Sequence, residues 1–218
     1  MDYIKTIDDY KIKIYYIKLN NIFTSDYKKL VDEFCNSNDM ENLNKFIYHE
    51  DKYRHLASII LQKYVTKKFN NHVFKNISYR DLFINRNQKP YIKISNNNFF
   101  SYNVSHDENM IVITFSQTHH VGIDIMKKEK EEQLEKINLF YNQIESNINK
   151  LKLWTLIESY YKCLGTGIVN VNDRGFYFVE NNNIINIYNR KNNKLIETDF
   201  FSFEIDNYII SICLILSH

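Results

Sequence analysis

Residues 150–164, KLKLWTLIESYYKCL, constrain the fold more than any other part of this sequence. Apolar side chains recur along them every three or four residues, which predicts a strongly amphipathic helix. Gly165 follows at once, and glycine is the residue that most often occupies the left-handed position after a helix. The apolar segments before and after this helix are short and rich in Ile, Phe and Tyr, as strands are. The sequence therefore predicts an α+β fold.

The order strand, helices, strands occurs twice along the chain. Strands are expected at 11–18, 99–105, 110–116, 121–126, 175–180, 184–189, 200–205 and 207–216, and helices at 27–34, 41–69, 129–150 and 150–164. The stretch 84–98, which holds the only proline, predicts a loop. We expect two similar α+β halves, residues 1–118 and 119–218, each with an antiparallel sheet packed against helices.

The composition excludes several classes of protein. A formal net charge of +2 and the lack of a recognisable RNA-binding motif argue against nucleic acid as the partner. No apolar run reaches the roughly 18 residues of a membrane span, and the N-terminal residues lack the apolar core of a secretory signal. Cys35, Cys163 and Cys213 form no CxxC pair and are odd in number, which is typical of reduced thiols. We expect a cytoplasmic protein that binds neither nucleic acid nor membrane.

Three ionisable residues of the second half give the strongest chemical signal. Asp124 lies in the apolar strand VGIDIM, where a carboxylate must be paired, hydrogen-bonded or metal-bound. Glu158 and Lys162 are four residues apart on the helix and share one face. Two carboxylates and an ammonium group together are able to hold a hard cation and a phosphate. Each has an ordinary explanation when taken alone, because Glu158 and Lys162 also suit a surface ion pair and Asp124 suits a cap.

Taken together, these residues resemble the signature of the Sfp-type 4′-phosphopantetheinyl transferases. The matching motifs, in chain order, are Arg54 opening the helix RHLASIILQKYV, Lys89-Pro90-Tyr91, Tyr102-Asn-Val-Ser-His106, Gly122-Ile-Asp-Ile, Phe140-Tyr-Asn-Gln-Ile-Glu145 and Trp154-x-x-x-Glu158-Ser-x-x-Lys162-x-x-Gly165-x-Gly167. Each motif alone is weak, but their order and spacing over residues 50–170 make the resemblance specific.

The resemblance implies an enzyme, a holo-[acyl-carrier-protein] synthase. Such an enzyme moves the 4′-phosphopantetheine arm of coenzyme A onto a serine of an apo acyl or peptidyl carrier protein and releases 3′,5′-ADP. It implies bound Mg²⁺, with Mn²⁺ as the alternative. The implied metal ligands are Asp124 and Glu158, and Lys162 would lie beside the leaving α-phosphate. The nucleotide phosphates would be bound by Ser105, His106 and Arg54, and the adenine by Lys89, Pro90 and Tyr91. Glu145 would lie near the metal and the incoming serine. Through the bridging metal and the phosphate, Asp124 and Lys162 also belong to the coenzyme A site. Glu158, acting directly or through a water, is the first candidate for the base that activates the serine, and Glu145 is the second.

The sequence departs from the family pattern at two positions. Met126 stands where bacterial members commonly carry a glutamate as third metal ligand, and we expect water there because a thioether binds Mg²⁺ poorly. The same methionine is typical of the eukaryotic group that resembles the human aminoadipate-semialdehyde-dehydrogenase phosphopantetheinyl transferase, so it marks a subgroup. Ile157 stands where many members carry a lysine, which puts one phosphate contact in doubt.

The resemblance also implies a monomer, built as a pseudo-dimer of two α+β halves with coenzyme A in the cleft between them. Carrier proteins of fatty-acid or polyketide biosynthesis are the expected partners, and the sequence also leaves a peptide synthetase or an aminoadipate reductase open. Such carriers are acidic on their docking helix, so the lysines of 127–128 and 150–152 are candidates for carrier contact; a solvated surface is their ordinary explanation. Two other functions stay open. One is a non-catalytic module that binds coenzyme A or a carrier protein on the same fold. The other is an RNA-associated or structural protein, suggested by the richness in Lys, Tyr and Phe.

Overall fold

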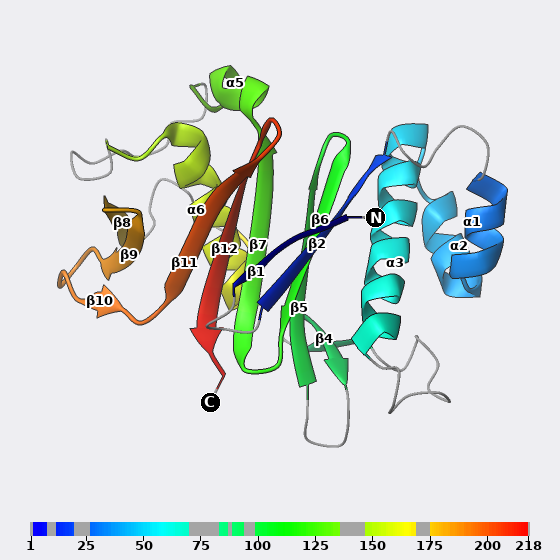
Figure 1. Ribbon diagram of the computed structural model, residues 1–218, viewed down its shortest axis with the longest axis horizontal. Helices are drawn as coiled ribbons and strands as arrows, with labels where there is room; N and C mark the ends of the chain where they lie inside the picture. The colour runs from blue at the N-terminus through cyan, green and yellow to red at the C-terminus, as the bar shows by residue number, and fades with distance from the viewer. Residues whose placement is uncertain are drawn as a thin grey trace.

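The computed structural model shows three antiparallel sheets packed against helices (Figure 1), which confirms the α+β class. It describes residues 2–7, 12–19, 27–69, 83–86, 89–93, 99–135, 147–168 and 175–217. Among these described residues, no helix is both long enough and apolar enough to cross a membrane.

The first sheet has six strands in the order β1-β2-β6-β5-β4-β3, each antiparallel to its neighbours. Its strands are β1 (Asp2–Ile7), β2 (Ile12–Lys18), β3 (Phe83–Arg86), β4 (Lys89–Lys93), β5 (Phe99–Asp107) and β6 (Met110–Ser116). Every residue of β6, MIVITFS, is buried. An apolar run without alternation is expected for a strand that is inside the sheet and covered on both faces.

One face of this sheet is covered by α3 (His49–Phe69), and α1 (Tyr27–Phe34) and α2 (Ser37–Asn44) lie on the outer side of α3 (Figure 1). Ala57 and Leu61 of α3 join the core of the sheet, whereas Ile59 and Ile60 join the core beneath α1 and α2. A helix buried on two sides needs apolar residues on two sides. The sequence predicts helix over 41–69 and does not decide whether it breaks near Glu50; the structure has two helices, α2 and α3, separated at residues 45–48.

The second half contains two three-stranded sheets, β11-β12-β7 and β10-β9-β8, and the helix α6 (Lys150–Leu164). Its other elements are β7 (His119–Lys127), η3 (Lys128–Lys130), α5 (Glu131–Glu135), β8 (Phe176–Asn181), β9 (Ile184–Asn189), β10 (Leu195–Ile196), β11 (Asp199–Ile205) and β12 (Tyr208–Leu216). The side chain of Asn149 accepts hydrogen bonds from the first turn of α6, and Gly165 ends the helix with φ at 75°. Both ends of the predicted helix are thus confirmed.

Two further differences from the sequence-based predictions concern strands. The stretch 84–98, predicted as a loop, contains part of the antiparallel hairpin β3–β4, in which Pro90 lies opposite Asn85. Proline is tolerated there because Pro90 precedes the residues of β4 that pair with β5, so the N–H group that proline lacks is not needed by β5. The edge strand β1 was not expected at all. Of the charged stretch 129–150, residues 136–146 lie outside the described part of the chain.

An apolar core joins the first sheet to the sheet β11-β12-β7. Ile12 and Val112 of the first sheet lie in one cluster with Ile123 and Ile210 of the second, and all four are fully buried. The strand β7 is an edge strand of its own sheet, and it makes extensive contact with β5 of the other (Figure 1). The seam between the two sheets therefore runs along β5 and β7.

A row of polar side chains on β5 binds the free edge of β7. We call Ser101, Asn103, Ser105 and Asp107 the β5 row, since alternate residues of a strand share one face. Three of its members accept hydrogen bonds from backbone N–H groups of β7: Ser101 Oγ from Val121 (3.0 Å), Asn103 Oδ1 from Ile123 (2.9 Å) and Asp107 Oδ2 from Lys127 (2.8 Å). These N–H groups point away from β12 and need acceptors because they are mostly buried.

All strands of the six-stranded sheet precede residue 118, and all strands of the other two sheets follow it. The division into halves at 1–118 and 119–218 agrees with this arrangement and stays a prediction.

Candidate active site

Helix α6 packs closely against β7 at Gly122, and this contact positions the site residues. A Cβ atom at this glycine would lie 2.0 Å from the backbone oxygen of Ser159 and 2.4 Å from the backbone nitrogen of Cys163. Only a residue without a side chain allows two backbones to approach so closely. Two residues farther along the same face of β7, Asp124 is consequently within reach of Lys162 on α6.

Asp124, Lys162 and Ser105 form a closed triangle of hydrogen bonds. The Nζ atom of Lys162 donates to Oδ1 of Asp124 at 2.6 Å and to Oγ of Ser105 at 2.9 Å, and Oγ of Ser105 donates to the same Oδ1 at 2.9 Å. Asp124 is only 6% exposed. Burial raises the pKa of Asp124 above its ordinary value, while Lys162, Ser105 and the N–H group of Ile125 oppose that rise. The triangle thus provides the compensation that a buried carboxylate requires.

Glu158 lies one helical turn before Lys162 and is half-buried. Its pKa is raised by desolvation and by the negative charge of Asp124, and the charge of Lys162 lowers it in part. Within the part of the chain that the structure describes, Glu158 has no hydrogen-bond or ion-pair partner. Its carboxylate is therefore free to take a proton or a cation.

Arg54 brings further positive charge to this end of the seam, and His106 lies within its electrostatic reach. His106 follows Ser105 on β5, faces the other way and has an exposed side chain. Its pKa is lowered by desolvation of part of the ring and by the positive charges of Arg54 and Lys162. Arg54, in the first turns of α3, also forms an ion pair with Asp51. The structure places Arg54, His106 and Lys162 within electrostatic reach of one another; their contact with nucleotide phosphates stays a prediction.

The residues predicted for the adenine lie on β4, at the opposite end of the seam. The hydroxyl of Tyr91 hydrogen-bonds to Nδ1 of His120 on β7 at 3.2 Å, and the two rings meet edge to face. Lys89 and Pro90 belong to the same strand, but their side chains are outside the described part. Glu145 lies outside the described residues altogether, so its predicted place near the metal is untested.

Met126 and Ile157, the two departures from the family pattern, both have apolar surroundings. Met126 shares the face of β7 with Asp124 and packs beside Trp154. The apolar cluster beneath them consists of Leu134, Leu151 and Ile209. Ile157 is fully buried in the core between α6 and the sheet β10-β9-β8, so it offers no contact to a phosphate.

The donor chemistry of Asp124 and Glu158 fits a hard divalent cation. The negative charge of Asp124 raises the proton affinity of Glu158, and a cation would relieve this repulsion. Mg²⁺ prefers one or two carboxylates together with water and phosphate oxygens. Among the described residues, no three His, Cys, Asp or Glu side chains come together as a metal site. A cation here would accordingly rely on two protein carboxylates, unless a residue outside the described part adds to them.

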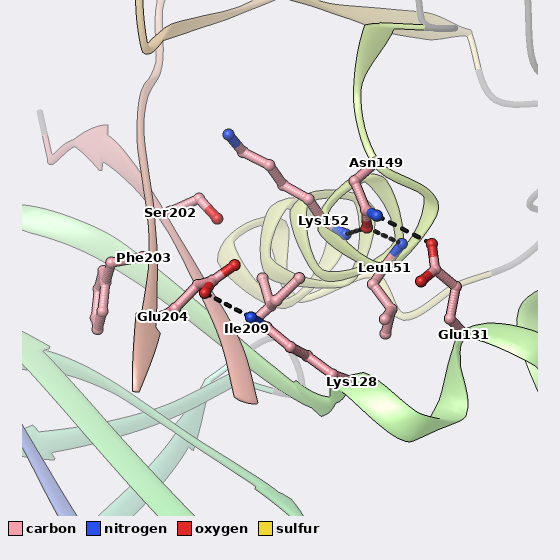
Figure 2. A pocket seen from close by; sticks show the side chains of 9 residues that line it. All are labelled: Lys128, Glu131, Asn149, Leu151, Lys152, Ser202, Phe203, Glu204 and Ile209. Carbon is pink, nitrogen blue, oxygen red and sulfur yellow. Dashed lines mark hydrogen bonds and ion pairs between the residues drawn. The ribbon is translucent and has the colours of Figure 1, made fainter. Parts of the chain in front are cut away.

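A pocket of about 310 Å³ lies between the start of α6 and the ends of β11 and β12 (Figure 2). It is lined by Lys128, Glu131, Asn149, Leu151, Lys152, Ser202, Phe203, Glu204 and Ile209. Lys128 pairs with Glu204 at 2.6 Å, and Asn149 donates a hydrogen bond to Glu131 at 2.9 Å, as the dashed lines of Figure 2 show. The charges of Lys128 and Glu204 at the rim of this pocket are thus largely neutralised by their mutual ion pair.

The lysines predicted to contact a carrier protein are mostly paired in the same way. Lys127 binds Glu108 at 2.9 Å, and Lys152 binds Glu180 at 2.5 Å. Their positive charge is compensated by carboxylates of this chain, which weakens the electrostatic argument for carrier docking at these positions.

Of the β5 row, Ser105 alone was predicted from the sequence to have a functional role. A signal was present: in FFSYNVSHD the polar residues 101, 103, 105 and 107 alternate with larger or apolar ones. On a strand covered on both faces, such alternation indicates a polar face that must meet polar groups of another element.

Comparison with known proteins adds evidence from the other half of the chain. Residues 24–118 match the family model described as 4′-phosphopantetheinyl transferase, N-terminal. A protein of Thraustochytrium sp. named "Phosphopantetheinyl transferase" is 22% identical over 155 residues, which cover 60% of this chain and 52% of that protein. The "4′-phosphopantetheinyl transferase gsp" of Aneurinibacillus migulanus is 21% identical over 221 residues, which cover 94% of this chain and 87% of that protein.

The chain thus spans about half the length of the first relative and most of the second. The family model ends at residue 118, before the signature from Gly122 to Gly167 begins. The segment that matches the family model and the segment that carries the signature are therefore separate, and both resemble phosphopantetheinyl transferases. Together, the family model and the relatives support a transferase enzyme that is similar to the phosphopantetheinyl transferases.

Proposed function

We propose that this chain transfers the 4′-phosphopantetheine group of coenzyme A to a serine of an apo acyl or peptidyl carrier protein. The serine oxygen attacks the β-phosphorus of coenzyme A, the bond from this phosphorus to the oxygen of the α-phosphate breaks, and 3′,5′-ADP leaves. The observation that carries the proposal is the Asp124–Lys162–Ser105 triangle, with Glu158 beside it, which has no hydrogen-bond or ion-pair partner among the described residues.

In this proposal, Lys162 acts on the leaving group. Its ammonium group is held at the seam by Asp124 and Ser105, with its side chain 29% exposed. A cation fixed in this way stabilises the charge that develops on the α-phosphate as the bond breaks, and it costs no reorganisation at that moment. It also has a proton to give to the leaving oxygen.

Glu158 is the candidate base for the serine. A base works best when its pKa lies near the working pH, and the neighbouring Asp124 and partial burial move the pKa of Glu158 upward from that of an ordinary glutamate. When bound, Mg²⁺ would supply positive charge to the pyrophosphate, and Asp124 and Glu158 are the residues that would hold it.

The proposal includes several finer points. Mn²⁺ is the alternative cation, the carriers belong to fatty-acid or polyketide biosynthesis, and the enzyme works as a cytoplasmic monomer. The chain falls in the eukaryotic group that carries methionine at the position of Met126. Supporting this last point, partly buried Met126 packs against an apolar cluster, a place that suits a thioether side chain.

The test is a mass measurement on carrier proteins. Purified protein is incubated with coenzyme A, Mg²⁺ and each of a panel of apo carriers, and the expected result is a gain of one phosphopantetheine on at least one. Asp124→Ala and Glu158→Ala should lose this activity, whereas Met126→Glu should retain it. No gain on any carrier, together with tight metal-independent binding of coenzyme A, would instead indicate a non-catalytic binding module.

A further inference from the structure

Ser105 occupies a place in the structure that differs from the phosphate-binding role suggested by its motif. We propose that Ser105 is a positioning residue, which sets Asp124 and Lys162 relative to each other, and that it gives no hydrogen bond to the 3′-phosphate of coenzyme A. This inference rests on the proposed function, since it concerns the same site.

The hydrogen-bonding capacity of the Ser105 hydroxyl is already committed. A serine hydroxyl has a single hydrogen to donate, and here it goes to Oδ1 of Asp124 at 2.9 Å. Its oxygen accepts from Nζ of Lys162 at 2.9 Å. A phosphate group presents only acceptor oxygens at neutral pH, so it needs donors. Only acceptor capacity is left on Ser105, and that would repel a phosphate.

Ser105 is also poorly accessible. It is 5% exposed, whereas its neighbour His106 points to the other face of β5 and is exposed. Arg54 and His106 are close enough to influence each other electrostatically. Phosphate recognition therefore falls to His106, on the other face of β5, and to Arg54 of α3.

The hydrogen bonds of the β5 row explain why Ser105 binds the carboxylate of Asp124. Its other members each bind a backbone N–H group of β7 that lies 20 residues farther along the chain. By the same spacing, Ser105 would accept from the N–H group of Ile125. That N–H group instead hydrogen-bonds to the carboxylate of Asp124, and Ser105 donates to this carboxylate. The Asp124 carboxylate thus lies between Ser105 and the N–H group of Ile125, and the hydrogen bond from Ser105 fixes its position.

The experiment compares Ser105→Ala with Ser101→Ala. Ser101 belongs to the same row and is similarly buried at 4%, and the partner of its hydroxyl among the described residues is the N–H group of Val121. Each protein is assayed for transfer with coenzyme A and with 3′-dephospho-coenzyme A, and the affinity for both is measured by calorimetry without a carrier. Binding of Mn²⁺ alone is followed by electron paramagnetic resonance.

The positioning role predicts a specific pattern. Ser105→Ala should lower kcat about tenfold with both donors, because one hydrogen bond to a charged group is lost. The preference for coenzyme A over 3′-dephospho-coenzyme A should stay within about twofold of the parent value, and Mn²⁺ binding should weaken severalfold. Arg54→Ala should reduce the preference. Ser101→Ala should leave kcat, preference and Mn²⁺ binding close to those of the parent.

Two results overturn the proposal. One is loss of the preference for coenzyme A in Ser105→Ala, which makes Ser105 a phosphate ligand. The other is a Ser105→Ala protein with unchanged kcat and Mn²⁺ binding. If the parent protein transfers nothing to any carrier, the proposed function fails, and the calorimetric preference and Mn²⁺ binding still decide the role of Ser105.

Discussion

Lys162 has two carboxylates near it and pairs with Asp124 on the strand instead of Glu158 on its own helix. Lys162 pairs with Asp124 because the two carboxylates differ in how well water can hydrate them. Asp124 is almost fully buried and cannot be hydrated, so an unpaired charge there would cost several kcal/mol. Glu158 is only half-buried and keeps contact with water, so it gains less from the pair. The result is an ion-paired carboxylate, Asp124, beside Glu158, whose carboxylate has no such partner among the described residues.

These two carboxylates should respond differently to removal. Asp124→Ala leaves the ammonium group of Lys162 without its charge partner, and we expect a loss of about 2 kcal/mol of stability, discounted because Lys162 is 29% exposed. Glu158→Ala removes a carboxylate that Asp124 repels, so stability should not fall. Both variants should lose transfer. Thermal denaturation checks this: the melting temperature should drop by about 6 °C for the first variant only. Equal drops would contradict this account of the site.

Cys35 should react slowly with alkylating agents while the chain is folded. Desolvation and the negative charge of Asp39 raise the pKa of this thiol to about 11, although Lys63 acts in the opposite direction. Only the thiolate reacts, so at every pH below that value folded Cys35 has less reactive form than an ordinary cysteine. Mass spectrometry after iodoacetamide treatment should show a rate that rises about tenfold per pH unit between roughly pH 8 and pH 10. A rate equal to that of the urea-unfolded chain would contradict the shift.

At the scale of elements, the parts predicted correctly are those whose signals are local. The bounds of α6 follow from Asn149 before it and Gly165 after it, and the orientation of Asp124 follows from alternation along one strand. The hairpin β3–β4 depends on pairing with β5, and β1 depends on pairing with β2, so neither has a signal within its own few residues. The bond from Ser105 to Asp124 joins two sheets and was likewise beyond sequence patterns.

The contact between α6 and β7 should fail when Gly122 gains a side chain. In Gly122→Ala the new Cβ would overlap the backbone of Ser159 and Cys163, so α6 must move away and Lys162 with it. We expect a loss of about 3 kcal/mol, near 10 °C in melting temperature, together with loss of transfer. The matched control is Gly175→Ala, because a Cβ there meets nothing within 4 Å. Similar melting temperatures for the two variants would show that the close approach is not needed.

At the scale of the whole molecule, β7 belongs to two structures at once. Its backbone pairs with β12 in its own sheet, and its outer edge is bound by side chains of β5 from the other sheet. Asp124 lies on this strand and Lys162 on the helix above it, while Ser105 comes from the first half. The triangle therefore exists only when both halves are folded and joined, which makes the stability of the seam a condition for the site.

The seam should depend on Asn103, in the middle of the β5 row. Asn103 is 9% exposed, and its Oδ1 accepts from the N–H group of Ile123, which is fully buried. Asn103→Ala leaves that N–H group without an acceptor and without access to water, at a cost of about 2 kcal/mol. Hydrogen exchange measured by NMR should show faster exchange of the Ile123 amide, and the melting temperature should fall by about 6 °C. Asn109→Ala, at the exposed turn between β5 and β6, is the control and should change neither. An Ile123 amide that stays as protected in Asn103→Ala as in the control would show that the apolar core alone holds the two sheets together.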